Sequence, residues 1–288
     1  MADQPANYGS ALGNLIVWLR QVVRATGNLK PATPKAKFIL ASISSGLKFA
    51  GSGLIDLFLP VRCSGCQKVA TGPQRSWCRS CWSQIPWIAS PLCPKCGRPF
   101  RDSGGASDYL CGECIESVFH FDSARSAVFH EGIVRSGIHR FKFGAQLEWT
   151  PSLVELLETT YAGWGLPAPD FIVPVPLHPS RLRQRGFNQS ALLAGEFARK
   201  AGLPVSFNVI ARKDQTLPQT RLKREERLKN VKGAFEISDS KMVRGRRILL
   251  VDDVFTTGTT LSECARTLKK KGGASEVHAL TVTRALPG

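Results

Sequence analysis

The sequence predicts an α/β fold, a parallel sheet flanked by helices, that is preceded by a small cysteine-rich region. From residue 121 onward, short apolar runs alternate with stretches of helical periodicity, which is the pattern of a parallel sheet. Before that point, four Cys-x-x-Cys pairs occur between residues 63 and 114. We therefore expect three segments: a helical extension at 1–54, a double metal ribbon at 55–120 and the α/β domain at 121–288.

The elements of the α/β domain follow from its apolar patterns. A short apolar run bounded by turn residues is typical of a strand, and apolar residues three and four apart are typical of a helix. Strands are expected at 127–129, 171–175, 205–210, 248–251 and 277–282, and helices at 152–161 and 189–200, the second ending before Gly202. Helical periodicity also recurs within residues 12–23 and 39–58, to which we assign no function.

The stretch from Ile248 to Thr260 carries the strongest functional signal. Four apolar residues run into Asp252 and Asp253, and the loop residues Thr256, Thr257, Gly258, Thr259 and Thr260 lead into a helical pattern. Backbone N–H groups and the dipole at a helix N-terminus attract anions, and glycine lets the backbone approach a ligand closely. The sequence therefore predicts a phosphate-sized loop at the C-terminal end of a buried parallel strand.

The adjacent carboxylates of Asp252 and Asp253 need a partner. Two such groups repel each other. They are tolerated if they accept hydrogen bonds from sugar hydroxyls or face a hydrated cation. The alternative is a helix N-cap beside a solvated acidic turn, which fits the order of residues 248–260 poorly.

The cysteine pairs indicate metal binding. Two Cys-x-x-Cys knuckles supply the four thiolates of a closed Zn²⁺ site, so two structural zinc ions are expected on Cys63, Cys66, Cys78, Cys81, Cys93, Cys96, Cys111 and Cys114. Sequential pairing of the knuckles is favoured, with interleaved pairing as the alternative. A disulfide framework is the competing interpretation, which the missing secretion signal disfavours. Trp77, Trp82 and Trp87 surround the second knuckle and fit a small ribbon core better than a base-stacking surface.

The net charge and the apolar content restrict the classes of partner and the cellular compartment that are expected. The net charge of +17 favours polyanions, either nucleic acid or a substrate with several phosphates, although a basic protein without a polymer partner has the same charge. No secretory signal and no run of 18 apolar residues is visible. Together with metal-type cysteine pairs, this predicts a cytoplasmic protein without a membrane span.

Basic residues cluster in two further places. The predicted strand at 171–175 leads into an arginine-rich loop that contains Arg183 and Arg185 and is stiffened by Pro174, Pro176 and Pro179. A stiff loop that presents several guanidinium groups suits pyrophosphate. The second cluster, residues 221–232, lies between two predicted strands, where a lid is often found. Lone charge runs are more often solvated surfaces.

These motifs resemble a known family. Residues 248–260 resemble the signature with which type I phosphoribosyltransferases bind 5-phosphoribosyl-1-pyrophosphate (PRPP). That resemblance implies a type I phosphoribosyltransferase-like fold, with Asp252 and Asp253 at the ribose hydroxyls and Thr256–Thr260 around the 5′-phosphate. The motifs Phe141-Lys142-Phe143, 185–189 and 220–227, together with the cysteine region, resemble the ComF competence family and its relative GntX.

The ComF resemblance implies a set of functional expectations. It implies binding of PRPP with Mg²⁺, transfer of phosphoribose to an unassigned acceptor, and a role in DNA uptake with single-stranded DNA among the partners. Lys142 joins Arg183 and Arg185 as a candidate for pyrophosphate. The alternative is a non-catalytic adaptor that binds single-stranded DNA through its zinc ribbons and basic surface.

Overall fold

The computed structural model describes residues 61–70, 76–100, 109–213 and 233–286. The expected N-terminal extension and the candidate lid at 221–232 lie outside these residues. None of the helices that are described is long and apolar enough to cross a membrane.

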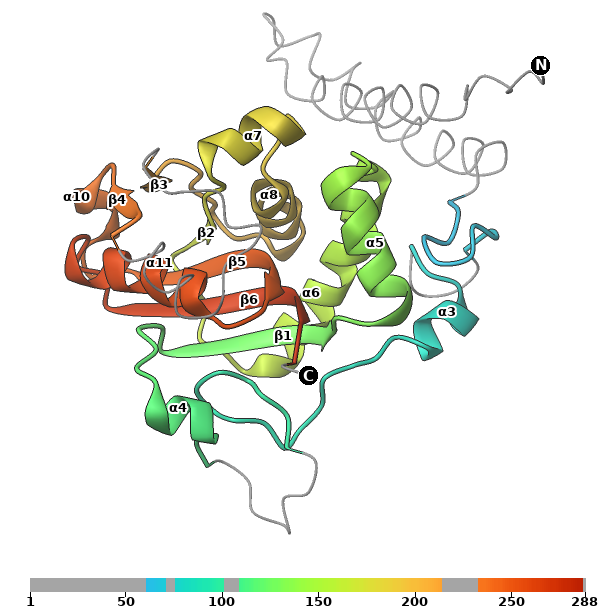
Figure 1. The fold of residues 1–288 in the computed structure, drawn as a ribbon, viewed down its shortest axis with the longest axis horizontal. Helices are drawn as coiled ribbons and strands as arrows, with labels where there is room; N and C mark the ends of the chain where they lie inside the picture. Colours follow the sequence, from blue (N-terminus) through green and yellow to red (C-terminus); the bar gives the residue numbers. More distant parts are fainter. Residues whose placement is uncertain (1–60, 71–75, 101–108, 214–232, 287–288) are drawn as a thin grey trace, which may run out of the picture.

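Four parallel strands form the central sheet (Figure 1). They are β1 (Ser123–Phe129), β2 (Phe171–Pro174), β5 (Arg247–Phe255) and β6 (Glu276–Arg284), arranged in the order β1-β6-β5-β2. The four corresponding strand predictions are confirmed. Strands β1, β5 and β6 are longer than expected, because their apolar runs continue into polar residues that still pair with a neighbouring strand.

The strand expected at 205–210 does not form as one element. Val205 makes a single parallel bridge to Ile172 in β2, after which the chain leaves the sheet edge through exposed residues Phe207 and Asn208. Strand β3 (Ile210–Arg212) then pairs antiparallel with β4 (Phe235–Ile237) in a separate two-stranded sheet. The prediction was wrong because two elements with different partners share one apolar run.

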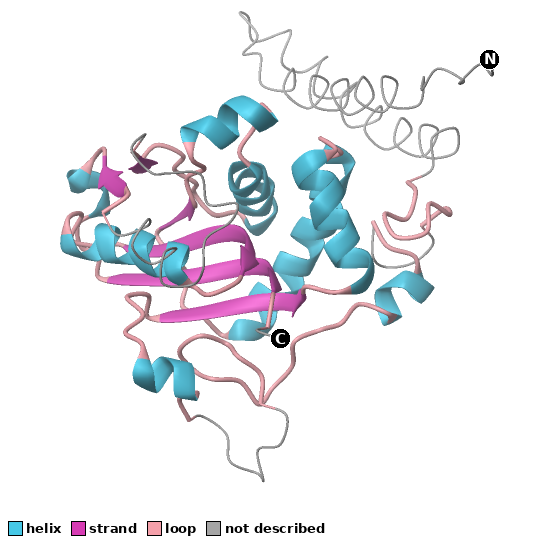
Figure 2. Ribbon diagram, viewed as in Figure 1, coloured by secondary structure: helices cyan, strands magenta, loops and turns pink. Residues whose placement is uncertain are grey.

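Helices cover both faces of the sheet (Figure 2). Apolar residues of α5 (Gly132–Phe143), α6 (Thr150–Trp164) and α8 (Gln189–Ala201) form one core cluster with one side of the strands. On the other side the core is built by α10 (Ser240–Val243), α11 (Thr259–Lys270) and the β3–β4 pair. The helix predictions at 152–161 and 189–200 are confirmed, and α8 ends at Gly202 with a φ of 67°.

The arginine-rich stretch after β2 is helical, which corrects the expectation of a loop. Helix α7 (Pro179–Arg185) has Pro179 at its first position and ends at Gly186 with a φ of 78°. Proline at the first helical position needs no N–H partner, and glycine adopts the left-handed conformation that ends many helices. The prolines therefore mark the start of a helix here.

The two cysteine knuckle pairs pack on opposite faces of the sheet. Cys63, Cys81 and Trp77 belong to the core cluster that contains α5, α6 and α8, whereas the second set of cysteines joins the cluster around α11. Small elements accompany the knuckles, α3 (Arg79–Ser83) in the first set and α4 (Gly112–Glu116) in the second. A 3₁₀ turn, η2 (Leu147–Trp149), precedes α6.

The segment after the second knuckle and the third knuckle itself run along the outer edge of β1. Ile88 N–H donates to Ala127 O at 3.0 Å, and Ala124 N–H donates to Lys95 O at 2.8 Å. These bonds pair backbone groups that an edge strand would otherwise leave open. The cysteine-rich region therefore covers an edge of the sheet as well as both of its faces.

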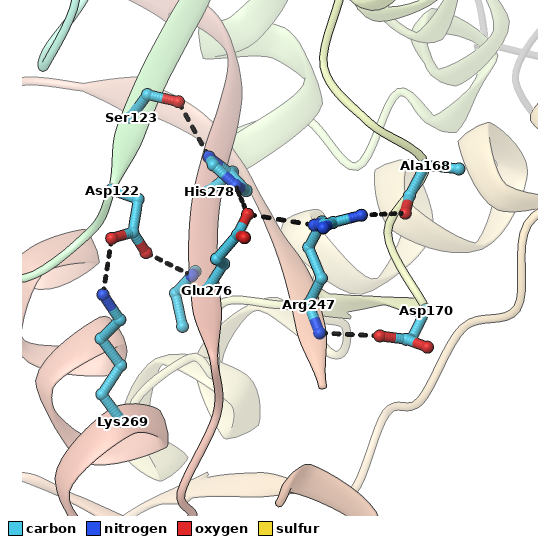
Figure 3. Close-up of polar contacts among 9 residues, drawn as sticks. Asp122, Ser123, Ala168, Asp170, Arg247, Lys269, Glu276 and His278 are labelled. Carbon is cyan, nitrogen blue, oxygen red and sulfur yellow. Dashed lines mark hydrogen bonds and ion pairs between the residues drawn. The ribbon is translucent and has the colours of Figure 1, made fainter. Parts of the chain in front are cut away.

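Polar contacts tie the N-terminal edge of the sheet together (Figure 3). His278 lies between Ser123 Oγ, 2.8 Å from its Nδ1, and Glu276 Oε2, 3.0 Å from its Nε2. Glu276 also accepts from Arg247 Nε at 3.0 Å, and the Arg247 backbone N–H donates to Asp170 at 2.7 Å. This network fixes the starts of β1, β5 and β6, at the edge opposite the phosphate loop.

Candidate functional site

The phosphate loop connects the end of β5 to the start of α11. Gly258 caps α11 with a φ of 71°, a conformation that side chains rarely adopt. A Cβ at this position would lie 2.6 Å from Cζ of Phe255 and 2.9 Å from Cε1 of Phe119. Both the backbone angle and the two rings beneath the loop therefore require glycine.

The threonines of the loop present hydroxyls around the N-terminus of α11. Thr257 Oγ1 and Thr259 Oγ1 lie 2.8 Å apart, and Thr256 is exposed. Hydroxyls both donate and accept hydrogen bonds, and the positive end of the α11 dipole lies at the same place. This arrangement suits the oxygens of a phosphate.

The acid pair lies within β5, which continues beyond its expected end to include Phe255. Asp252 Oδ1 accepts from Ser190 Oγ at 2.6 Å, and Asp253 Oδ1 lies 3.0 Å from Nζ of Lys142. The two carboxylates thus have different partners, which eases their mutual repulsion.

The pKa of Asp252 is raised to about 7. Burial is the main cause and the charge of Asp253 adds to it, while the hydrogen bond from Ser190 acts in the opposite direction. A carboxyl group with such a pKa changes its charge near neutral pH. Ligand binding that needs the carboxylate should therefore depend on pH.

Lys142 and Arg185 approach Asp253 from two helices. Lys142 lies in the last turn of α5. Arg185, at the end of α7, donates to Gln189 Oε1 at 3.0 Å and lies 4.8 Å from the ring centroid of Phe143. Burial lowers the pKa of Arg185, an effect that Asp253 opposes.

Arg183 lies apart from this group. Its side chain is exposed on α7, and it forms no hydrogen bond or ion pair within the described part of the chain. The structure thus brings Lys142 and Arg185, but not Arg183, next to the acid pair.

Ser190 is a site residue to which sequence reasoning assigned no role. Asn188 caps α8 by accepting from Ser190 N–H at 3.1 Å, and its Nδ2 donates to Val175 O at 3.2 Å. The cap fixes the start of α8 at the end of β2, which places Ser190 against Asp252. The Asn-x-Ser order predicts a helix start, but the contact with a strand 62 residues away is tertiary.

The eight knuckle cysteines form two four-sulfur clusters. Sequential pairing is confirmed, because the groups are Cys63, Cys66, Cys78 and Cys81, and Cys93, Cys96, Cys111 and Cys114. Sulfur atoms from different knuckles lie 3.6–3.7 Å apart, near the edge of about 3.8 Å that Zn–S bonds of about 2.3 Å give a tetrahedron. Disulfide sulfurs would be about 2.05 Å apart.

Backbone donors also suit zinc-bound thiolates. Cys81 N–H donates to Cys78 Sγ and Cys111 N–H to Cys93 Sγ, each at 3.4 Å. The residues therefore fit two closed, structural zinc sites. The ninth cysteine, Cys264, is fully buried in α11, and burial raises the pKa of its thiol, as expected for a packing residue.

Comparison with known proteins identifies both parts of the chain. Residues 54–119 match the double zinc ribbon domain, and residues 188–286 match the phosphoribosyl transferase domain. Competence protein F of Haemophilus influenzae is 31% identical over 233 residues, which are 79% of this chain and 99% of that protein. The chain belongs to the ComF family.

Other members of the ComF family are similarly related. The DNA utilization protein YhgH of Salmonella typhi is 35% identical over 64% of this chain and 80% of its own length. Competence protein ComFC of Bacillus subtilis is 29% identical over 74% of this chain and 85% of its own length. The family resemblance drawn from the motifs is therefore confirmed, and with it the double ribbon and the phosphoribosyltransferase-type α/β fold.

Proposed function

We propose that this ComF-family chain binds PRPP with Mg²⁺ at the C-terminal edge of β5 and transfers its phosphoribosyl group to an acceptor. The observation that carries the proposal is the phosphate loop, in which Gly258 packs directly over two aromatic rings. Carboxylates and cations lie beside this loop. In open α/β sheets, ligands bind at the carboxyl ends of strands, where neighbouring strands send their connections to opposite faces. Strands β2 and β5 meet this condition, since α8 and α11 cover different faces.

Each group at the site has a proposed role. Residues Thr256–Thr260 hold the 5′-phosphate, and Asp252 and Asp253 accept hydrogen bonds from the ribose hydroxyls. Lys142 and Arg185 neutralise the pyrophosphate, and Arg183 is a weaker candidate because its side chain points to solvent. Two carboxylates are suitable partners for a hydrated Mg²⁺, which would supply further neutralisation of the pyrophosphate when bound.

The reaction class follows from these roles. The bond between the anomeric carbon and the pyrophosphate oxygen breaks, the oxygen keeps the electron pair, and the acceptor forms the new bond at the anomeric carbon. Lys142 and Arg185 stabilise the charge that develops on the departing pyrophosphate, and Asp252 and Asp253 orient the ribose. The residues of the chain thus act by positioning and electrostatics.

The cellular role proposed for this activity is DNA uptake or utilisation. The names of two relatives, a competence protein and a DNA utilization protein, support this proposal. The alternative, a single-stranded DNA adaptor, has no support from the tryptophans. Trp77 is fully buried and donates to Ser152 O at 3.2 Å, and the rings of Trp82 and Trp87 pack against each other with centroids 5.0 Å apart. These contacts leave Trp77 unable to stack on bases.

The affinity for PRPP should rise with pH through neutrality. Below pH 7 the Asp252 carboxyl is largely protonated, and the ionised form accepts stronger, charge-assisted hydrogen bonds from the ribose hydroxyls. For a group of this pKa, the ionised fraction increases about tenfold between pH 6 and pH 8, which sets the upper limit for the rise in affinity. Calorimetric titration with PRPP and Mg²⁺ across this range measures the effect.

The variant Asp252→Asn separates the contribution of the protein to this pH dependence from the contribution of the ligand. Phosphate groups of PRPP also titrate near pH 6, and their contribution persists in the variant. The proposal predicts that the variant loses most of the pH dependence. An identical pH profile in both proteins would show that Asp252 does not contact the ligand.

A further inference from the structure

Arg284 connects the second cysteine cluster to the candidate site. It is the last residue of β6 and is only 3% exposed. Its Nη1 donates to Cys96 O at 2.6 Å, and its Nη2 lies 3.5 Å from Cys96 Sγ. Within the residues that the structure describes, no carboxylate forms an ion pair with it.

A buried guanidinium needs a negative partner, because burying an unpaired charge is costly. Four thiolates around Zn²⁺ carry a net charge of −2, and the cluster of Cys93, Cys96, Cys111 and Cys114 is the group that Arg284 contacts. The position of Arg284 is therefore explained by a metal-loaded second cluster.

The same guanidinium lies against a ring beneath the phosphate loop. Its Cζ is 4.2 Å from the ring centroid of Phe255, and the backbone of Phe255 accepts from Ala285 N–H at 2.9 Å. Phe255 is also the residue whose ring would lie 2.6 Å from a Cβ at Gly258. Arg284 is thus packed between a zinc ligand and the ring beneath the loop.

The chain that follows Cys114 makes a second connection between the cluster and the phosphate loop. Phe119, five residues after Cys114, stacks on Phe121 with centroids 5.0 Å apart, and its ring also lies beneath Gly258. The next residue, His120, donates its N–H to Ser262 Oγ in the first turn of α11 at 3.1 Å. Both rings under the loop are therefore anchored to the second cluster.

We propose that the second zinc cluster, acting through Arg284 and Phe255, holds the phosphate loop in its binding conformation. Arg284 is then a positioning residue, and metal occupancy of this cluster is coupled to ligand binding at the loop. The identity of the ligand as PRPP rests on the proposed function, but the coupling between the zinc cluster and the loop does not. The first cluster packs on the opposite face, against α6, and serves as an internal control.

Hydrogen–deuterium exchange of the full-length, zinc-loaded protein tests the coupling without any ligand. The variant Cys114→Ser, which disrupts the second cluster, should speed amide exchange in residues 256–262 about tenfold, a size typical of coupled sites. The matched variant Cys66→Ser, in the first cluster, should leave these amides unchanged. Unchanged exchange in Cys114→Ser after measured zinc loss, or equal acceleration in both variants, would overturn the proposal.

Substitution of Arg284 provides the second arm, since all eight cysteine ligands remain. Arg284→Met should keep two zinc ions per chain, speed exchange in the loop and release zinc from the second cluster more quickly to a chelator. Arg284→Lys keeps the charge and should restore part of the protection. Wild-type loop exchange in a folded Arg284→Met protein would contradict the positioning role.

Coupling is reciprocal, so a bound ligand must protect the metal. In the Cys66→Ser protein, PRPP with Mg²⁺ should slow chelator-driven zinc loss from the second cluster by about the same tenfold factor. Tight PRPP binding without protection of zinc would overturn the coupling. Absence of PRPP binding together with zinc-dependent loop exchange would instead refute the proposed ligand and leave the coupling supported.

Discussion

Replacement of Lys142 by methionine is expected to lower the free energy of unfolding by about 3 kcal/mol, the lower end of the range for breaking a buried ion pair. Lys142 and Asp253 lie 3.0 Å apart, with side chains that are 21% and 9% exposed. Methionine keeps most of the apolar stem but removes the ion pair between Lys142 and the Asp253 carboxylate. Urea unfolding of the ligand-free protein measures the loss.

Two further variants make this prediction specific. The double variant Lys142→Met/Asp253→Asn should regain much of the lost stability, because the uncompensated charge is removed with its partner. The exposed pair of Arg199 and Glu196 is the matched control, and Arg199→Met should cost about 0.5 kcal/mol or less. A Lys142→Met protein as stable as the wild type would show that the ion pair contributes nothing to the site.

Replacement of Gly258 by alanine is expected to reduce the affinity for PRPP more than tenfold. The left-handed backbone costs a side chain about 1–2 kcal/mol, and a Cβ 2.6 Å from the Phe255 ring adds about 1–3 kcal/mol of overpacking. The loop can relieve this strain only by moving away from the rings that support it. Calorimetric titration with PRPP and Mg²⁺ measures the consequence.

Gly202→Ala is the matched control for the strain of a left-handed backbone without overpacking. Gly202 has a φ of 67°, and a Cβ added there would have no neighbouring atom within 4 Å, so Gly202→Ala should lose stability without losing affinity. If Gly258→Ala bound PRPP as well as the wild type, the loop would not be the phosphate site.

Patterns within short stretches of sequence predicted the parts of this fold that depend on residues close to one another along the chain. The buried runs of β2 and β6 and the start of α8 at Asn188 follow from spacing along the chain. Each of these features is determined by residues that are close in sequence, which is why it could be recognised without a structure.

The inclusion of the acid pair in β5 could not be predicted in this way. Aspartate is disfavoured in strands, so the expected strand ended at Val251. Pairing with β6, in which Asp252 lies opposite Thr281 and Val254 opposite Thr283, extends β5 through both carboxylates. That extension places Asp252 beside Ser190 of α8 and Asp253 beside Lys142 of α5.

Partners from distant segments were also beyond local reasoning. Ser190 meets Asp252 because α8 and β5 pack together, and Arg284 reaches Cys96 across 188 residues. Helix α7 was a different kind of miss, since Pro179 at its start and Gly186 at its end are helix signals that the arginines obscured.

Calorimetric titration of the zinc-loaded protein with PRPP and Mg²⁺, beside the variant Asp252→Asn/Asp253→Asn, tests the central claim most directly. The account predicts one PRPP bound per wild-type chain. The variant should bind about 100-fold more weakly, because two hydrogen bonds to charged groups contribute about 3 kcal/mol. Equal binding by both proteins, or no binding by the correctly folded wild type, would contradict a PRPP site at the end of β5.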